Sequence, residues 1–268
     1  MSDKIRGVGL NLRLEFIDEF LDRSPSVDFV EVIVDNYHSH GPHHEKLLKV
    51  RENYEISFHC VGMNLAGEDD LNISYLNTVK KLMHKFDPFL ISDHLCFQKN
   101  KNICFHDLLP FPLTKEYLDH VTERVARVQE VIGKSLLIEN LSYYVEFNNS
   151  EMSEYEFLNE LSRRAGSKIL LDFNNIWVNE KNLAKSSREY LENINWNLVG
   201  ECHFAGAEKI DDLYVDTHGT NIDNEVLLLA SEYSKELKNT PLVYERDNNI
   251  PALDELLGQR NRLIESLQ

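Results

Sequence analysis

Six strand-like segments of this chain end on a side chain that can bind a metal ion. They are His59 in ISFHC, His94 in LISDH, Glu139 in LLIEN, Asp172 in ILLDF, His203 in GECHF and Glu245 in PLVYE. An acid or an imidazole at the end of an apolar strand is costly to bury unless it has a partner. One such end is explained by a local hydrogen bond, but a run of them indicates ligands that converge on one place. Imidazole together with carboxylate suits iron, manganese, zinc or cobalt.

Strand order divides these residues into two sets. His59, His94 and Glu139 have the composition of an iron site with two histidines and one carboxylate. The second set is Asp172, His203 and Glu245. Glu139 lies between the two sets in strand order, so its carboxylate is a candidate bridge between two metal ions. We expect the catalytic residues to be Glu139, Asp172 and His203.

A third candidate group includes the segment VDTHG. Asp216 and His218 are two residues apart, which puts both side chains on one side of an extended segment. Asn174 lies two residues beyond Asp172 and shares its strand face, so its amide oxygen is a further candidate ligand. Taken singly, these residues also fit a buried hydrogen bond or a loop ion pair. Their occurrence together favours metal binding.

Other polar residues have simpler interpretations. The stretch HSHGPHH contains His38, His40, His43 and His44. Its turn residues predict a solvated or substrate-facing loop after the second strand. Glu31 and Asp35 share one parity on that strand, and Asp35, near the rim, is a candidate for orienting a ligand.

The cysteines do not form a CxxC pair. They are Cys60, Cys96, Cys104 and Cys202. Strand alternation points Cys60 and Cys202 away from the face that the neighbouring histidines use. We expect buried free thiols in a reducing compartment.

The elements that must position these side chains alternate between strand and helix. We expect strands at residues 5–10, 28–35, 54–60, 88–94, 135–140, 168–174, 197–204 and 241–246. Their short apolar cores are typical of parallel strands covered on both faces. This pattern predicts an α/β fold, a TIM-type (βα)8 barrel forming a single domain over residues 1–268. A doubly wound sheet is the alternative, but the barrel explains the polar strand ends because its active site is built at that rim.

The helix patterns lie between the strands. They cover residues 14–23, 73–86, 115–133, 154–166, 222–238 and 251–266, with one more opened by Ser186 and Glu189. Ser153 with Glu156 is a capping box, and Gly133 and Gly166 suit helix ends. Pro251 fits the first turn of the last helix.

Composition narrows the class of protein further. The chain has 268 residues, 42% of them hydrophobic, and a net charge of −17, which disfavours nucleic-acid binding. Neither a signal peptide nor a membrane span is evident, so we expect a cytoplasmic protein. The fingerprints GxSxG, GxGxxG and the P-loop are absent from the sequence, which leaves serine hydrolases and nucleotide-binding proteins without support.

Several runs of sequence resemble a known family. They are FVEVIVDNY, SFHCVG, LISDHL, FHDLLPFPLT, LLIENLSYY, LLDFNNIW, CHFAGAE, VDTHG and YERDNNIP. In this order they resemble the multinuclear non-haem iron-dependent oxidative enzymes, which include the methanobactin maturation enzyme. Many members carry a histidine soon after the first strand, whereas this chain reads GLNLRLEF. That departure leaves the exact reaction open.

The resemblance implies two or three irons, mixed Fe(II) and Fe(III), at the barrel rim. His59, His94 and Glu139 would hold one iron, and Glu139 would bridge to a second. The ligands of the second are Asp172, His203 and Glu245, and those of a third, more labile metal are Asn174, Asp216 and His218. Asn140 and Asn175 match family positions but face elsewhere, which implies a supporting role.

The implied activity is O2-dependent modification of cysteine in a ribosomally made precursor peptide, with a small partner protein that recognises the leader. Two other functions fit the residues. One is a divalent-metal isomerase or hydrolase acting on sugars or phosphate esters, although we find no Lys/Arg cluster for phosphate near the strand ends. The other is a metal- or peptide-binding module without turnover.

Overall fold

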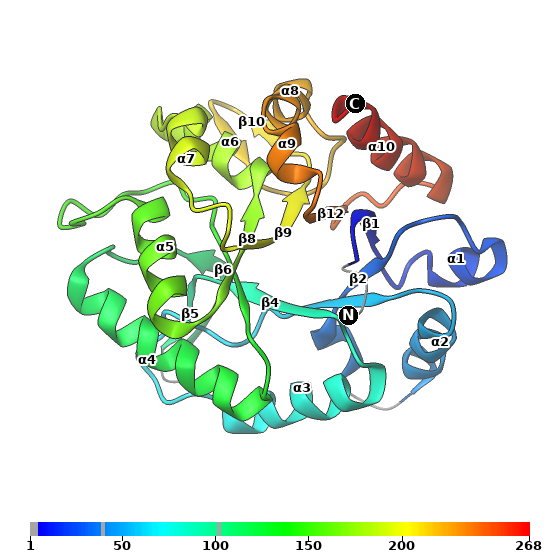
Figure 1. The fold of residues 1–268 in the computed structure, drawn as a ribbon, viewed down its shortest axis with the longest axis horizontal. Coiled ribbons are helices and arrows are strands. Elements are labelled where there is room, and N and C mark those ends of the chain that lie inside the picture. Colours follow the sequence, from blue (N-terminus) through cyan, green and yellow to red (C-terminus); the bar gives the residue numbers. More distant parts are fainter. Residues whose placement is uncertain (1–4, 39–40, 101–102) are drawn as a thin grey trace.

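The central feature of the fold is a closed barrel of eight parallel strands (Figure 1). The computed structural model describes residues 5–38, 41–100 and 103–268, apart from the side chain of His106. The barrel strands are β1 (Gly7–Asn11), β2 (Val30–Ile33), β3 (Ile56–His59), β4 (Leu90–His94), β7 (Leu137–Glu139), β8 (Lys168–Asp172), β9 (Val199–Phe204) and β12 (Pro241–Tyr244). They follow one another around the barrel in chain order, and β12 closes it by pairing with β1. The predicted TIM-type fold is confirmed.

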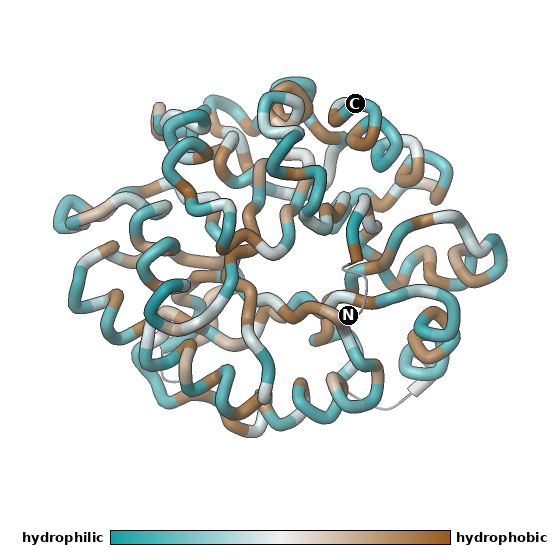
Figure 2. The backbone as a smooth tube through the Cα atoms, in the orientation of Figure 1, coloured by the Kyte–Doolittle hydropathy of each residue, from teal (hydrophilic) through white to brown (hydrophobic). Residues whose placement is uncertain are grey.

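Helices surround the barrel as the sequence pattern requires. They are α1 (Ile17–Arg23), η1 (Val34–Tyr37), α2 (Pro42–Arg51), α3 (Ile73–Phe86), α4 (Lys115–Ile132), α5 (Glu154–Ala165), α6 (Phe173–Leu183), α7 (Ser187–Asn193), α8 (Asn224–Glu232), α9 (Ser234–Leu237) and α10 (Leu253–Ser266). Apolar residues concentrate along the strands at the centre of the molecule (Figure 2). The core is therefore the barrel wall with the helix faces that pack on it.

The caps that were predicted from the sequence are present. The hydroxyl of Ser153 accepts from the backbone N–H of Glu156 and the Glu156 carboxylate accepts in return, which completes the capping box of α5. Ser186 caps α7 in the same position. Gly133 and Gly166 end α4 and α5 with positive φ, where a residue without Cβ avoids strain.

Several predicted element boundaries were wrong, among them the end of the strand 28–35, because Val34 and Asp35 lie in η1. The predicted strand 168–174 ends at Asp172, because the Asp172 side chain caps helix α6 from residue 173 onwards. The predicted helix 222–238 breaks at Tyr233 into α8 and α9. Pro251 precedes α10 instead of lying in its first turn, since the helix begins at Leu253.

Two hairpins on the rim side were not predicted. One is formed by β5 (Phe97–Asn100) and β6 (Ile103–Leu109) after β4, and the other by β10 (Glu208–Ile210) and β11 (Leu213–Val215) after β9. They occupy long connections that the strand and helix periodicities left unassigned. Among the described residues, no helix is long and apolar enough to cross a membrane.

The histidine-rich stretch HSHGPHH is more than a loop. Pro42 begins α2, and the buried His44 ring contacts the carbonyl oxygen of Tyr37 at 2.5 Å. His44 therefore packs in the fold rather than in a solvated loop, and His40 lies outside the described residues. Cys60, Cys96 and Cys202 are buried free thiols as expected, whereas Cys104 is exposed on β6.

Candidate metal centre

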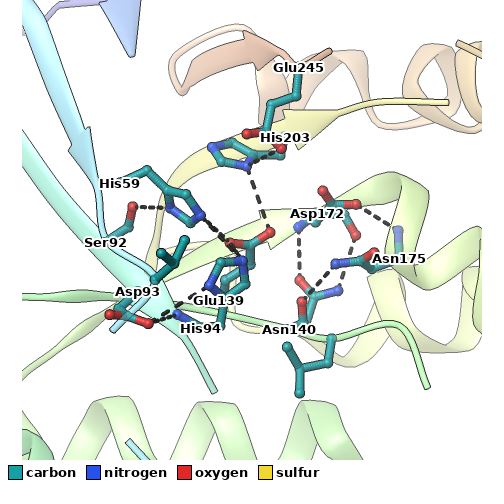
Figure 3. A network of polar contacts seen from close by, with 12 residues as sticks. His59, Ser92, Asp93, His94, Glu139, Asn140, Asp172, Asn175, His203 and Glu245 are labelled. Carbon is teal, nitrogen blue, oxygen red and sulfur yellow. Dashed lines mark hydrogen bonds and ion pairs between the residues drawn. The ribbon is translucent and has the colours of Figure 1, made fainter. Parts of the chain in front are cut away.

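The polar strand ends meet at the C-terminal rim of the barrel. His94 lies opposite Glu139 in the register of β4 and β7, and Asp172 lies opposite His203 in that of β8 and β9. Glu245 follows directly after β12, which pairs with β9. Figure 3 shows these side chains pointing toward one another from different strands. Register and barrel closure thus bring together residues that are far apart in the sequence.

The first group has the spacing of ligands around one ion. Nε2 of His59 and Nε2 of His94 are 3.3 Å apart, and they lie 3.5 and 3.3 Å from the same oxygen, Oε2 of Glu139. Two nitrogens that each lie about 2.1 Å from one metal ion would be about 3.0–3.4 Å apart. The Nδ1 atom of His59 forms a hydrogen bond with the hydroxyl of Ser92 at 2.8 Å, which turns Nε2 toward the site.

The second oxygen of Glu139 faces the other set of residues. Oε1 lies 3.7 Å from Nδ1 of His203, and Glu139, Asp172 and His203 have ligand atoms within 4.8 Å of one another. A single carboxylate therefore directs one oxygen to the pair His59 and His94 and the other to His203. This is the geometry that a bridging carboxylate needs.

His203 is held between two carboxylates. Its Nδ1 lies 3.0 Å from Oε2 of Glu245, and its Nε2 lies 3.1 Å from Oε2 of Glu31. Asn11 donates from Nδ2 to Oε1 of Glu31 at 3.0 Å and to Oε1 of Glu245 at 3.1 Å. Glu31 was noted only for its parity, and Asn11 was missed altogether. A buried acid within the apolar strand VEVI was the signal that pointed to Glu31.

Asn174, Asp216 and His218 also come together, though not in the way that the sequence suggested. Asn174 lies in the first turn of α6, so it does not share a strand face with Asp172. Its amide donates to Oδ1 of Asp216 at 2.6 Å, and Nε2 of His218 lies 2.8 Å from the same oxygen. His218 has φ 48°, an uncommon conformation for a non-glycine residue, and its Nδ1 lies 3.4 Å from Glu245. The third group therefore adjoins the second through Glu245.

Two asparagines hold Asp172 in place, as expected of supporting residues. Asn140 accepts from the backbone N–H of Asp172 at 2.8 Å and donates to its carbonyl at 3.1 Å. Asn175 donates from its side chain to the carbonyl of Asn140 at 3.0 Å, and its backbone N–H donates to Oδ1 of Asp172 at 2.6 Å (Figure 3). The other oxygen of Asp172 is left directed toward the site.

Asp35 lies apart from this network. Its carboxylate accepts from the N–H of Val61 and from the hydroxyl of Tyr75, both at 3.1 Å. It braces the segment after β3 and contacts none of the candidate ligands among the described residues. Asp35 thus acts on the backbone that follows His59 and not on a ligand side chain.

Burial and crowding strongly shift the pKa values of these side chains. Burial raises the pKa of Glu139 well above its usual value and that of Asp172 to about 7. Burial also lowers the pKa of His59, and the nearby His94 and His203 lower it further. For His203 the carboxylates of Glu245 and Glu31 outweigh burial and raise the pKa well above its usual value. Buried acids and imidazoles in one cluster are the donor set that a cation would stabilise.

The side-chain atoms left without a hydrogen bond fit a bound cation. They include Oε2 of Glu139, Oδ2 of Asp172 and Oδ1 of Asn174, all of them buried oxygens. Buried polar atoms are normally satisfied, so such a group of acceptors requires an explanation. Above them is a cavity of about 360 Å³, lined in part by His59, His94, Glu139, His218 and Glu245. The wall of this cavity thus includes candidate ligands of the first group and of the third, together with Glu245 of the second.

Fold and site together define a class: a (βα)8 barrel with a candidate multinuclear metal centre at its rim. A family model described as "RiPP precursor modification enzyme MbnB/TglH/ChrH" matches residues 7–268. The chain therefore belongs to this family, whose members modify ribosomally synthesised precursor peptides. The family resemblance noted in the sequence is confirmed.

Two relatives match almost the whole chain, and a solved structure shares its fold. The chain is 34% identical to a UPF0276 protein of Acaryochloris marina, covering 95% of this chain and 92% of that one. It is 36% identical to a UPF0276 protein of Anaeromyxobacter sp., covering 98% and 93%. D-psicose 3-epimerase from Clostridium cellulolyticum superposes with a TM-score of 0.66 at 12% identity, over 97% of this chain and 98% of that one. At that identity the likeness concerns the fold alone.

Proposed function

We propose that this protein is a multinuclear iron enzyme that uses O2 to modify cysteine in a ribosomally made precursor peptide. The observation that carries the proposal is Glu139, whose two oxygens face different histidine-containing groups at 3.3–3.7 Å. Histidine and carboxylate donors suit iron, and the family acts on precursor peptides. The proposal includes a small partner protein that recognises the peptide leader.

The proposed ligand sets follow the side-chain groups. His59, His94 and Glu139 hold the first iron, and Glu139 bridges to the second. The second is held by Asp172, His203 and Glu245, and the third by Asn174, Asp216 and His218. Bound iron would supply the redox chemistry with O2 and an open position for a substrate thiolate. Glu139, Asp172 and His203 are the proposed catalytic residues because they lie where the first two sets meet.

The protein itself contributes positioning of the substrate. The cavity of about 360 Å³ has room for a cysteine with its flanking backbone. Its walls include Ser142 and Tyr144, and the Ser142 hydroxyl donates to Asp216 at 3.1 Å. A peptide in this cavity would have its thiol beside the candidate ligands, which favours reaction at cysteine over other residues.

The test is co-expression with the cysteine-bearing peptide and the partner encoded beside this gene. Mass spectrometry should find a defined change of mass at a cysteine, and only when O2 is present. A precursor with that cysteine replaced by serine is the substrate control, and Glu139→Ala is the enzyme control. Turnover without O2 would contradict the proposal and favour the metal-dependent isomerase or hydrolase. An unchanged precursor in every condition would favour the binding module.

A further inference from the structure

A second cavity lies beside the candidate metal centre. Its volume is about 130 Å³, and the apolar side chains in its wall include Phe111, Leu113, Val145, Phe147 and Met152. Val145 is 60% exposed and Phe147 is 39% exposed, although both are large and hydrophobic. Apolar side chains around a concave surface mark a site where a ligand binds.

Two chain segments form the boundary between this cavity and the metal-centre cavity. Ser142 and Tyr144 line the metal-centre cavity, whereas Tyr143 and Val145 line the apolar one, and Leu141 borders both. This is the side-chain alternation of an extended segment. The second segment passes from one cavity to the other, with residues 107–108 on the metal side and residues 110, 111 and 113 on the apolar side. The two cavities are therefore neighbours that share a wall.

Size and polarity identify what the apolar cavity can hold. An apolar cavity of about 150 Å³ binds benzene, so this one suits a single leucine, methionine or phenylalanine side chain. The wall also contains the buried Glu154, whose Oε1 accepts from the N–H of Leu141 at 3.1 Å. Burial raises the pKa of Glu154 to about 7, so this carboxyl is partly neutral near neutral pH. Lys185 at the edge is already paired with Glu146 at 2.5 Å. The cavity consequently favours a neutral side chain.

We propose that the apolar cavity is a specificity subsite for the peptide substrate, which binds an apolar side chain one or two positions from the modified cysteine. The inference rests on the proposed function, because the occupant is the peptide whose cysteine enters the metal-centre cavity. Continuity through Leu141 allows one extended peptide to fill both cavities. The segment 141–147 then acts as a partition between the reacting residue and its neighbour.

The experiment measures binding without turnover. Zinc binds thiolates but is redox-inert, so the zinc-loaded protein is titrated with short peptides in a calorimeter. The probes are acetyl-Ser-Leu-Cys-Ser-amide, its isomers with leucine at the other nearby positions, and acetyl-Ser-Ser-Cys-Ser-amide. We expect at least one leucine peptide to bind about tenfold more tightly than the serine peptide.

Two variants test whether the preference for leucine peptides comes from the apolar cavity. Val145→Arg places a charge at the cavity mouth and should bring the ratio of affinities to about one, with little change for the serine peptide. Leu228→Arg is the control, since Leu228 on α8 is 64% exposed and lies outside both cavities. It should keep the wild-type ratio.

The results of the two experiments separate the proposed subsite from the proposed function. Equal affinities in the wild type, a ratio that persists in Val145→Arg, or no binding of any peptide would overturn the subsite. The proposed function is judged separately by the change of mass in the co-expressed precursor. A modified precursor without leucine preference leaves the enzyme and removes the subsite. A leucine preference without any modified precursor leaves the subsite and removes the oxidative reaction.

Discussion

Glu139 connects two groups of candidate ligands. Its two oxygens face different histidines, and burial makes its charged form costly without a cation. A residue that bridges two ions and a residue that binds one should differ in how much metal their removal releases. This difference can be measured without knowing the substrate.

We expect Glu139→Ala to lose more than one metal equivalent per chain, whereas His59→Ala should lose about one. Protein purified anaerobically with iron is analysed by metal quantification, with the wild type expected to hold more than one iron. His120→Ala is a suitable control, since His120 lies on α4 and bonds the carbonyl of Gly67 at 2.9 Å, outside the candidate centre. Full iron retention in Glu139→Ala would rule out the bridge.

Glu31 determines which nitrogen of His203 is available to bind a metal ion. The Nδ1 atom faces Glu139 and Glu245, so the Nε2–H is the donor to Glu31 at 3.1 Å. A carboxylate behind a ligating histidine fixes its tautomer and orientation, and loss of such partners typically costs about 10–100-fold in metal affinity.

We therefore expect Glu31→Gln to weaken iron binding by about 10–100-fold while the protein stays folded. Affinity is measured by competition with a chelator, and folding by circular dichroism. Glu201→Gln is the control, because Glu201 is equally buried on β9 but bonds no histidine among the described residues. If the iron affinity of Glu31→Gln equalled that of Glu201→Gln and of the wild type, the orienting role of Glu31 would be excluded.

The connections after the strands decide the shape of the rim. The β5–β6 and β10–β11 hairpins and the segment 141–153 expose large apolar side chains, among them Ile103, Val145, Ile210 and Leu213. In TIM barrels such connections carry specificity while the strands carry the reactive groups.

The segment after β11 supplies Asp216 and His218 of the third group, which we expect to hold a metal ion least tightly. His218 lies 13% exposed and in a left-handed conformation, and Asn174 reaches the group from a helix. We expect His218→Ala to deplete a third metal equivalent and to leave the other two in place. Metal content after a short chelator treatment measures this. Loss of all iron in His218→Ala would show that the groups do not bind independently.

Helix α5 is joined to the segment 141–147 through Glu154, which gives a pH dependence. Burial raises the pKa of this carboxyl from 4.5 to about 7, so the folded state retains a proton that the unfolded state loses. The stability associated with this group is complete below pH about 4.5 and declines as the pH rises toward 7. In chelator-treated protein, Glu154→Gln should be more stable than the wild type by about 2–3 kcal/mol at pH 8, with little difference at pH 4.5.

Urea unfolding of the two proteins at both pH values measures the effect. Glu156→Gln is the matched control in the same turn of α5, because Ser153 holds the pKa of Glu156 below its usual value. This substitution should not stabilise the protein at pH 8. An unchanged stability difference between pH 4.5 and 8 for Glu154→Gln would show that Glu154 is ionised in the folded protein.

At the scale of the whole molecule, buried acids from different strands gather at the C-terminal rim of the barrel. Glu31, Glu139, Asp172 and Glu245 come from four different strands or strand ends, and each is at most 2% exposed. A cation among them should stabilise the folded barrel because it binds only where these strands are assembled.

Anaerobic addition of Fe(II) at about 100 times its dissociation constant should stabilise the barrel by about 2.7 kcal/mol and raise Tm by roughly 5–10 °C for each occupied site. Scanning calorimetry with and without a chelator measures this. The same addition to His203→Ala should give a smaller rise in Tm, because this variant lacks a proposed ligand of the second metal ion. An identical Tm with and without iron in the wild type would contradict metal binding at the centre.

The sequence alone determined the barrel and most of the candidate centre. Eight apolar strands of regular spacing, six of them ending in an acid or an imidazole, require a rim where those ends meet, whatever the details of packing. The ligand roles themselves stay a prediction until metal content is measured. Capping boxes were equally readable because their residues are close in the sequence.

Tertiary structure alone decided which side chains meet. Asn11 bonds Glu245 across 234 positions because β12 closes the barrel against β1, and strand parity does not encode that register. Asn174 reaches Asp216 from a helix, because Asp172 ends its strand by capping α6. The same barrel closure decides that the two oxygens of Glu139 face different groups. It also decides which residues form the wall between the metal-centre cavity and the apolar one. Local sequence fixes the face a residue uses, but long-range packing fixes its partners.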